Sequence, residues 1–180
     1  MSAGRGAAAR MLQAACVALV AGAAASPADA AFVYRLDREA PVRACKAASD
    51  AFRAPVRFRP MAVANGGAAD VFVTCGWSGF APGGNRRASQ FGIYVHAHGQ
   101  AATVTCTAVH GSGDAEAGSN VYVTRTLELQ AGYAGGALLF DRWQAGLPQT
   151  AFGRAQVSCM LSPGVELYHV TVNYEEDIGS

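Results

Sequence analysis

Short segments with alternating apolar and polar residues recur along the chain. In residues 91–98, FGIYVHAH, the apolar Phe91, Ile93, Val95 and Ala97 fall on one side of the alternation. The polar residues Tyr94, His96 and His98 fall on the other. This period of two is that of a β-strand with one buried face. Comparable segments, separated by Gly, Pro and Asn, predict further strands at 32–36, 56–59, 70–75, 102–109, 120–129, 136–143, 155–161 and 165–174. Helical periodicity is confined to a turn or two within residues 44–52.

Roughly eight or nine short strands with turn residues between them are typical of an antiparallel β-sandwich of the jelly-roll or Greek-key type. We predict this all-β fold for a single domain at residues 31–180, with a closed β-barrel as the alternative. A domain of this length buries about two thirds of the surface that its unfolded chain exposes.

A related tripeptide recurs in three of the predicted strands, as Val-Thr-Cys twice and as Val-Ser-Cys once. The alternation puts its cysteine, Cys75, Cys106 or Cys159, on the side of the valines, so we predict that all three face the core. Together with Cys45 they make an even number after residue 30, which indicates two disulfides in an exported chain. Of the three possible connectivities we favour Cys45–Cys75 with Cys106–Cys159, because these pairs join segments in the same half of the chain. The sequence contains no Cys-x-x-Cys motif, which argues against a zinc site and against a thioredoxin-type dithiol.

The first thirty residues have the pattern of a secretory signal peptide. Arg5 and Arg10 precede an apolar run that ends at Ser26, and Ala-Asp-Ala at 28–30 is a small-x-small cleavage site. The run is Ala-rich and short for a membrane anchor, so we predict secretion, extracellular or periplasmic, and no membrane span after cleavage. The mature chain then has a net charge near zero, which gives it no electrostatic attraction to nucleic acid.

Two histidines, His96 and His98, are two residues apart and therefore project from the same face of a predicted strand. Such a pair binds zinc, copper or nickel when a third ligand joins it, and His110 and His169 are the other histidines. A small secreted hydrolase or metal-dependent enzyme that uses His96 and His98 is therefore one hypothesis. Ser78, in GWSGF, lacks the Gly-x-Ser-x-Gly pattern of a nucleophile elbow. We favour a protein without catalytic residues, and we predict no cofactor.

Aromatic side chains favour a binding role. Trp77 and Trp143 fall at strand ends, and Tyr94 and Tyr122 fall on the polar side of alternating strands. Planar rings at such positions stack on sugars or on an apolar patch of a partner. Our first hypothesis is therefore a non-catalytic module that binds a glycan, a surface or a protein partner. A structural or inhibitory secreted protein is the third hypothesis, beside the enzyme.

The layout of the cysteines within their strands resembles that of a loosely defined group of small secreted bacterial proteins with no assigned activity. The segments that carry the resemblance are VANGGAADVFVTC, GIYVHAHGQAATVTCTAV and AQVSCMLSPGVELYHVTV, which follow the early Cys45. The likeness covers about residues 40 to 174. It implies a disulfide-linked β-sandwich and no particular reaction, and it transfers no site residue.

Overall fold

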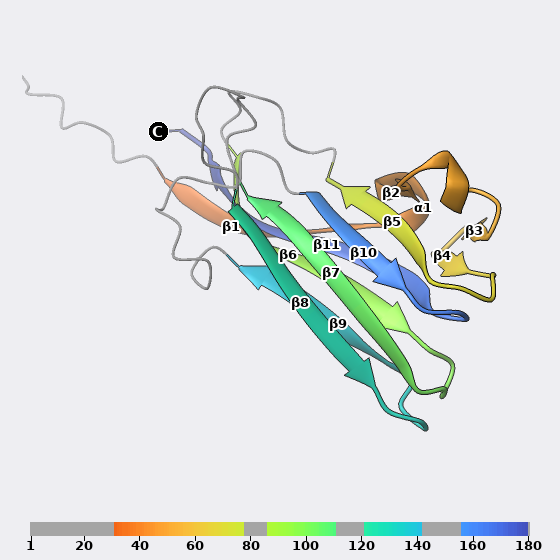
Figure 1. Cartoon of the computed structure of the whole chain (residues 1–180). Helices are drawn as coiled ribbons and strands as arrows, with labels where there is room; N and C mark the ends of the chain where they lie inside the picture. Colours follow the sequence, from red (N-terminus) through yellow and green to blue (C-terminus); the bar gives the residue numbers. More distant parts are fainter. Residues whose placement is uncertain (1–30, 78–85, 111–120, 142–155, 180) are drawn as a thin grey trace, which may run out of the picture.

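Two antiparallel sheets packed face to face make up the protein (Figure 1). The computed structural model describes residues 31–77, 86–110, 121–141 and 156–179. The predicted signal peptide, residues 1–30, lies outside the described residues. Along the chain the elements are β1 (Phe32–Glu39), α1 (Pro41–Ala44), β2 (Cys45–Ala47), the 3-10 helix η1 (Asp50–Phe52), β3 (Val56–Arg59), β4 (Ala62–Asn65), β5 (Val71–Gly76), β6 (Arg86–His96), β7 (Ala102–His110), β8 (Val121–Leu129), β9 (Gly135–Asp141), β10 (Gln156–Leu161) and β11 (Glu166–Asp177).

The strands divide between a sheet A and a sheet B. Sheet A has the order β3-β4-β11-β6-β9, and β1 pairs with the part of β11 that lies beyond β4. Sheet B has the order β2-β5-β10-β7-β8. Every strand pairing within the described part of the chain is antiparallel. The two sheets stay separate, which confirms the predicted β-sandwich and excludes the closed barrel that was its alternative.

The core lies between the inward faces of the two sheets. Its largest fully buried side chains are Phe91, Phe140, Ile93, Leu161 and Leu167. Each such side chain stabilises the fold by roughly 1.5–3 kcal/mol relative to an exposed position. The inward face of each strand is therefore set by its apolar alternation.

Both disulfides have the favoured connectivity. Cys45 and Cys75 lie opposite each other on β2 and β5, and Cys106 and Cys159 lie opposite each other on β7 and β10. Cys75, Cys106 and Cys159 have no exposed surface, which confirms that the cysteines of the three tripeptides face the core. Both cross-links join adjacent strands of sheet B.

Two short strands, β2 and β4, were not predicted. All four residues of β4 are buried, so it shows no alternation of apolar and polar positions. β2 interrupts the helical periodicity predicted at 44–52, because Cys45 is held in an extended conformation opposite Cys75. The two helices that flank β2 are a single turn each, and no helix in the described ranges has the length and hydropathy needed to cross a membrane.

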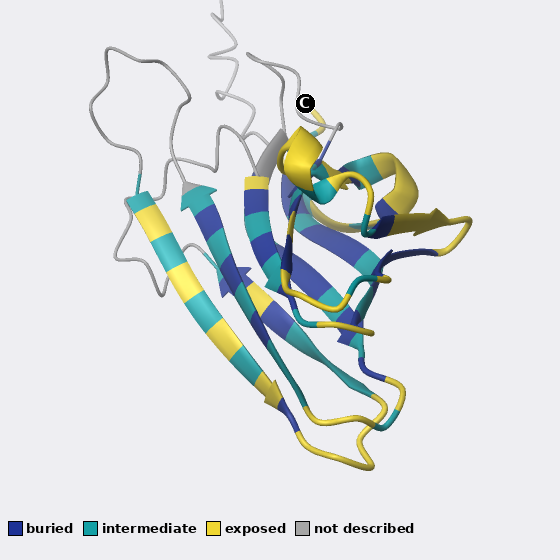
Figure 2. Cartoon of the chain, turned by 45° about the vertical axis from the view of Figure 1, so that its right-hand side comes forward, coloured by how far each residue is buried: buried dark blue, intermediate teal, exposed yellow. Residues whose placement is uncertain are grey.

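The outer faces of the two sheets differ in how exposed their side chains are. On sheet B, exposed and half-buried residues alternate along β8 (Figure 2). On sheet A, the outward residues Tyr94 and Tyr168 of β6 and β11 are half-buried, and their rings contact each other. The ordered outward side chains of sheet A form the candidate site.

Candidate functional site

A row of directly opposed residues crosses the outer face of sheet A. The register places Arg57 opposite Ala64, and Ala64 opposite Glu166. Glu166 in turn lies opposite His96, which lies opposite Gly135. Directly opposed residues of neighbouring strands share a face, so five strands bring these residues to one strip of surface. The small side chain of Ala64 leaves space above β4 between Arg57 and Glu166.

His98 reaches the same strip from the turn that follows β6. The amide of Gln100 donates to the carbonyl oxygen of Ala97 at 2.9 Å and closes this turn. His98 and Gly99 have positive φ angles of 51° and 79°, as the two central residues of a type I′ turn do. The turn holds the imidazole against His96, with ring centroids 4.4 Å apart and ring planes at 87°. His98 therefore lies in a turn, and not on the strand that was predicted to carry both histidines, and the turn brings its ring beside that of His96.

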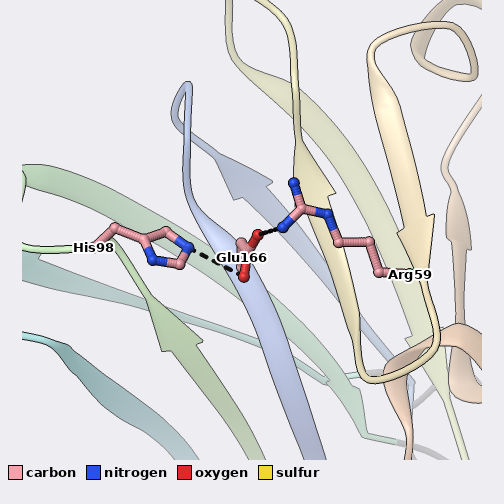
Figure 3. Close-up of polar contacts among 3 residues, drawn as sticks. All are labelled: Arg59, His98 and Glu166. Carbon is pink, nitrogen blue, oxygen red and sulfur yellow. Dashed lines mark hydrogen bonds and ion pairs between the residues drawn. The ribbon is translucent and has the colours of Figure 1, made fainter.

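Glu166 contacts two basic side chains from opposite sides (Figure 3). Its Oε1 accepts a hydrogen bond from the guanidinium of Arg59, and its Oε2 lies 3.1 Å from Nε2 of His98. The Glu166 side chain is 14% exposed, whereas those of Arg59 and His98 are 56% and 53% exposed. Removing a carboxylate from water is costly, and hydrogen bonds to basic side chains offset that cost. These two contacts fix the orientation of the carboxylate.

Further rings continue the strip along the outer face. Tyr168 lies at a β-bulge in β11, where the register with β6 shifts between Leu167 and His169. Because the bulge adds one residue, the adjacent rings of Tyr168 and His169 both contact Tyr94, with centroids 6.3 Å away in each case. The ring of Tyr168 also lies 6.4 Å from that of His96. We call the set Tyr94, His96, His98, Tyr168 and His169 the ring band.

A pocket of about 310 Å³ opens beside the ring band and shares His98 with it. One wall comes from strands β3 and β11, through Arg57, Arg59 and Glu166. The other comes from the turn that carries His98 and Gln100. Its lining therefore combines cationic, anionic, imidazole and amide groups.

Asn65 lines this pocket and is held in place by hydrogen bonds. Its side chain donates to the carbonyl oxygens of Ala69 and Leu161 at 2.9 and 2.8 Å, and its Oδ1 accepts from the amide of Gly67 at 2.9 Å. Its backbone amide donates to the carbonyl oxygen of Val165 at 2.9 Å. Asn65 is 2% exposed, and these bonds satisfy a polar side chain that would otherwise be costly to bury.

The strip offers aromatic and imidazole rings together with donors and acceptors of hydrogen bonds. His98 contacts Glu166 and His96, and neither contact supplies a hydroxyl or thiol that an imidazole would activate as a nucleophile. The described residues contain no group of three or more His, Cys, Asp or Glu side chains placed to hold a metal ion. Metal binding by His96 and His98 stays a prediction.

The structure separates the four aromatic residues that were predicted to bind a ligand. Tyr94 lies in the ring band. Tyr122 is 66% exposed but lies on the outer face of sheet B, opposite Val109. Trp143 lies outside the described residues.

Trp77, the fourth, is a core residue and does not face a ligand. It is 6% exposed, its ring centroid lies 5.1 Å from that of Tyr174, and its Nε1 donates to Oδ2 of Asp37 at 2.8 Å. Trp77 continues the inward series of Val73 and Cys75, so the alternation of β5 carries it into the core.

Sequence reasoning missed six residues of the site, namely Arg57, Arg59, Asn65, Gln100, Tyr168 and, as a partner of the histidines, Glu166. The spacing of two between the arginines on a predicted strand is a signal that both share one face. Glu166 and Tyr168 have no comparable signal, because the strand register brings Glu166 to the histidines and the bulge turns Tyr168 toward the rings.

No family model and no curated protein matches the chain. Solved structures similar to it include the CBM22-1–GH10 modules of xylanase 10B from Clostridium thermocellum complexed with xylohexaose, at 14% identity and a TM-score of 0.37. That likeness covers 66% of this chain and 22% of the xylanase chain, so this chain spans about a fifth of its length.

Two further similar structures are a carbohydrate-binding module and a Cry protein core. The family 11 carbohydrate-binding module from Clostridium thermocellum, in complex with a mixed-linked tetrasaccharide, is 7% identical, with a TM-score of 0.36 and 81% of this chain and 86% of the module covered. A Cry1Da tryptic core variant from Bacillus thuringiensis is also 7% identical, with a TM-score of 0.37 and coverages of 77% and 23%. With TM-scores under 0.5, these likenesses carry no argument about a ligand.

Proposed function

We propose that the protein is a non-catalytic glycan-binding module whose ligand lies along the ring band and reaches into the adjoining pocket. The observation that carries the proposal is the continuous series of rings on the outer face of sheet A, directly beside a pocket lined by charged and amide side chains.

A sugar ring has an apolar face of C–H groups and an edge of hydroxyl groups. Aromatic side chains pack on the apolar face. Arginine, glutamate and glutamine side chains form hydrogen bonds with the hydroxyl groups at the edge. Arg57, Glu166 and Gln100 supply the second kind of contact next to Tyr94 and Tyr168, which supply the first. An apolar ligand would leave the pocket's polar groups without partners, so the combination favours a saccharide.

The cross-links support the same proposal. Two disulfides are typical of proteins that work outside the reducing cytoplasm. Polysaccharides of cell surfaces and of the environment are accessible in that location, which the predicted signal peptide also favours.

Isothermal titration of the oxidised protein against a panel of neutral and acidic oligosaccharides tests the proposal. We expect one sugar class to bind, and Tyr94→Ala or Tyr168→Ala to weaken that binding about tenfold or more, since a stacked ring contributes substantially to a small interface. Tyr122→Ala is the matched control, because it removes an exposed tyrosine from the other sheet.

Thermal unfolding of the three variants shows whether any loss of binding is a loss of folding. If no oligosaccharide in the panel binds, the proposed function is wrong. If Tyr122→Ala weakens binding as much as Tyr94→Ala does, glycan binding stands but the ring band is not the site.

A further inference from the structure

Positive charge exceeds negative charge in the pocket beside the ring band. Its charged side chains are Arg57, Arg59 and Glu166, and His98 adds positive charge when it is protonated. The single carboxylate is already engaged, because Arg59 and His98 hold one of its oxygens each. Among the described residues no acidic side chain pairs with Arg57. The pocket therefore presents a guanidinium whose charge nothing in its described surroundings offsets.

The position of Arg57 depends on a glycine. A Cβ atom built on Gly66 would lie 2.2 Å from Nε of Arg57 and 2.6 Å from its Cδ, so the side chain rests on the bare backbone of residue 66. The amide of Gly66 donates to the carbonyl oxygen of Pro55 at 2.9 Å, which holds that backbone beside β3. Gly66 and Asn65 thus form a support that keeps the guanidinium at the pocket.

Two arginines of one strand line the pocket together. Arg57 and Arg59 are two residues apart on β3, on the same face and about 7 Å apart along the strand. Guanidinium groups bind carboxylate and sulfate oxygens through paired, charge-assisted hydrogen bonds. Glu166 positions Arg59 for this contact. A volume of about 310 Å³ is at the lower end for ligand pockets, which suits one charged sugar unit at the end of a longer chain.

We infer that the glycan is acidic, and that a carboxylate of a uronic acid or a sulfate ester binds in the pocket between Arg57 and Arg59 while neighbouring sugar units lie on the ring band. This inference rests on the proposed glycan-binding function. Both anionic groups present oxygen atoms in similar geometry, and the experiment distinguishes them.

The experiment compares ligands that differ in charge and share a backbone. Trigalacturonate is titrated against its methyl ester, and a sulfated galactan oligosaccharide against its desulfated form. We expect the charged member of one pair to bind about tenfold tighter than its neutral partner, because charge-assisted hydrogen bonds are roughly twice as strong as neutral ones. Raising the salt concentration should reduce this preference, because salt screens exposed charges.

Three variants locate the anion site. Arg57→Gln removes the guanidinium, and Gly66→Ala displaces it without removing it, because the flexible end of Arg57 moves more easily than the backbone. Both should reduce the preference for the charged ligand to about twofold or less. Arg53→Gln is the matched control: it removes the same charge from an exposed arginine that pairs with Asp50, and it should leave the preference unchanged.

The results separate the proposed glycan-binding function, the acidic character of the glycan and the location of the anion site. Equal binding of charged and neutral partners overturns the acidic-glycan inference and leaves the proposed function standing. A charge preference that survives in Arg57→Gln and Gly66→Ala overturns the assignment to this pocket. Failure of every oligosaccharide, neutral or charged, overturns the proposed function and the inference with it.

Discussion

The two outer faces of the sandwich use their polar side chains differently. On sheet B, hydroxyl groups bond to one another across strands, at 2.8 to 3.0 Å; the pairs are Thr74–Ser158, Thr105–Thr126 and Thr107–Thr124. On sheet A, the Asn173–Gln90 pair is bonded in the same way, but the outward groups around Glu166 are rings, two arginines and one shielded carboxylate. A surface whose donors and acceptors satisfy each other has less to offer a ligand. This difference supports the placement of the proposed site on sheet A.

The sheets also differ in regularity. Both disulfides lie in sheet B, and its strand pairings show no register shift in the described residues. The pairing of β11 with β6 in sheet A shifts twice, and the first shift turns Tyr168 toward the ring band. Bulges redirect side chains at the cost of regular pairing. A cross-linked sheet B thus supports a less regular sheet A that carries the candidate site.

Removing a cross-link of sheet B should have the largest effect on stability. The Cys106–Cys159 disulfide joins residues 53 apart, and the chain-entropy model gives it about 4 kcal/mol. The double variant Cys106→Ala/Cys159→Ala should lose about that much free energy of unfolding, measured by urea titration without reductant. Since the free energy of unfolding of a folded domain is about 5–15 kcal/mol, a domain at the lower end of this range would be partly unfolded at room temperature.

The second disulfide provides the control for that experiment. Cys45 and Cys75 are 30 residues apart, so Cys45→Ala/Cys75→Ala should lose about 0.5 kcal/mol less than the first double variant. An unchanged urea midpoint in both double variants would contradict the view that sheet B is the stabilising scaffold.

Removing the side chain of Asn65 should have the next largest effect, because it links the two sheets. Asn65→Ala leaves the carbonyl oxygen of Leu161, at the end of β10, without its bond from β4 and should cost about 2–3 kcal/mol. It should also weaken glycan binding, since Asn65 lines the pocket. Asn173→Ala is the control: its side chain bonds Gln90 on a half-buried surface, where water replaces the bond, and the loss should stay below about 1 kcal/mol. Similar losses in the two variants would sink this account.

Trp77 links the sheets as well, and its replacement separates a structural role from a ligand-binding one. Trp77→Phe keeps a ring in the core but removes the hydrogen bond to Asp37 of β1. The expected loss is about 1–2 kcal/mol of unfolding free energy, with glycan affinity unchanged. A large loss of affinity in a variant that keeps its thermal midpoint would return Trp77 to the binding site.

Most of the fold could be predicted from the sequence because alternation is a local property. The strands around Ile93, Val104 and Val157 each show their buried face in their own residues, and the cysteine positions follow from the same period. β4 could not be predicted in this way, since Asn65 and its three neighbours in the strand are all buried. Its place depends on pairing with β11, which is distant in sequence.

The candidate site could be predicted only in part, for the same reason. Tyr94 and His96 share a face of one strand by their spacing, whereas the turn at His98 and Gly99 brings His98 beside them. Glu166 joins them through the register between β11 and β6, and no local pattern contains that register. For Trp77 the local pattern was sufficient but was not followed. The alternation of β5 predicts its burial, whereas its position at a strand end led to the prediction of a binding role.

The smallest stability effect is expected from substitutions on the outer face of sheet B. These substitutions also test whether sheet A, and not sheet B, binds the ligand. The double variant Thr107→Val/Thr124→Val removes an exposed hydroxyl pair and replaces it with residues of the same shape that favour strands. Unfolding free energy should change by less than about 0.5 kcal/mol, because both partners of the bond are removed together. Glycan affinity should stay within about twofold of the unmodified protein, since this face has no part in the proposed site. If affinity falls tenfold while the thermal midpoint holds, the hydroxyl face of sheet B binds the ligand, and the assignment of scaffold and binding face must be reversed.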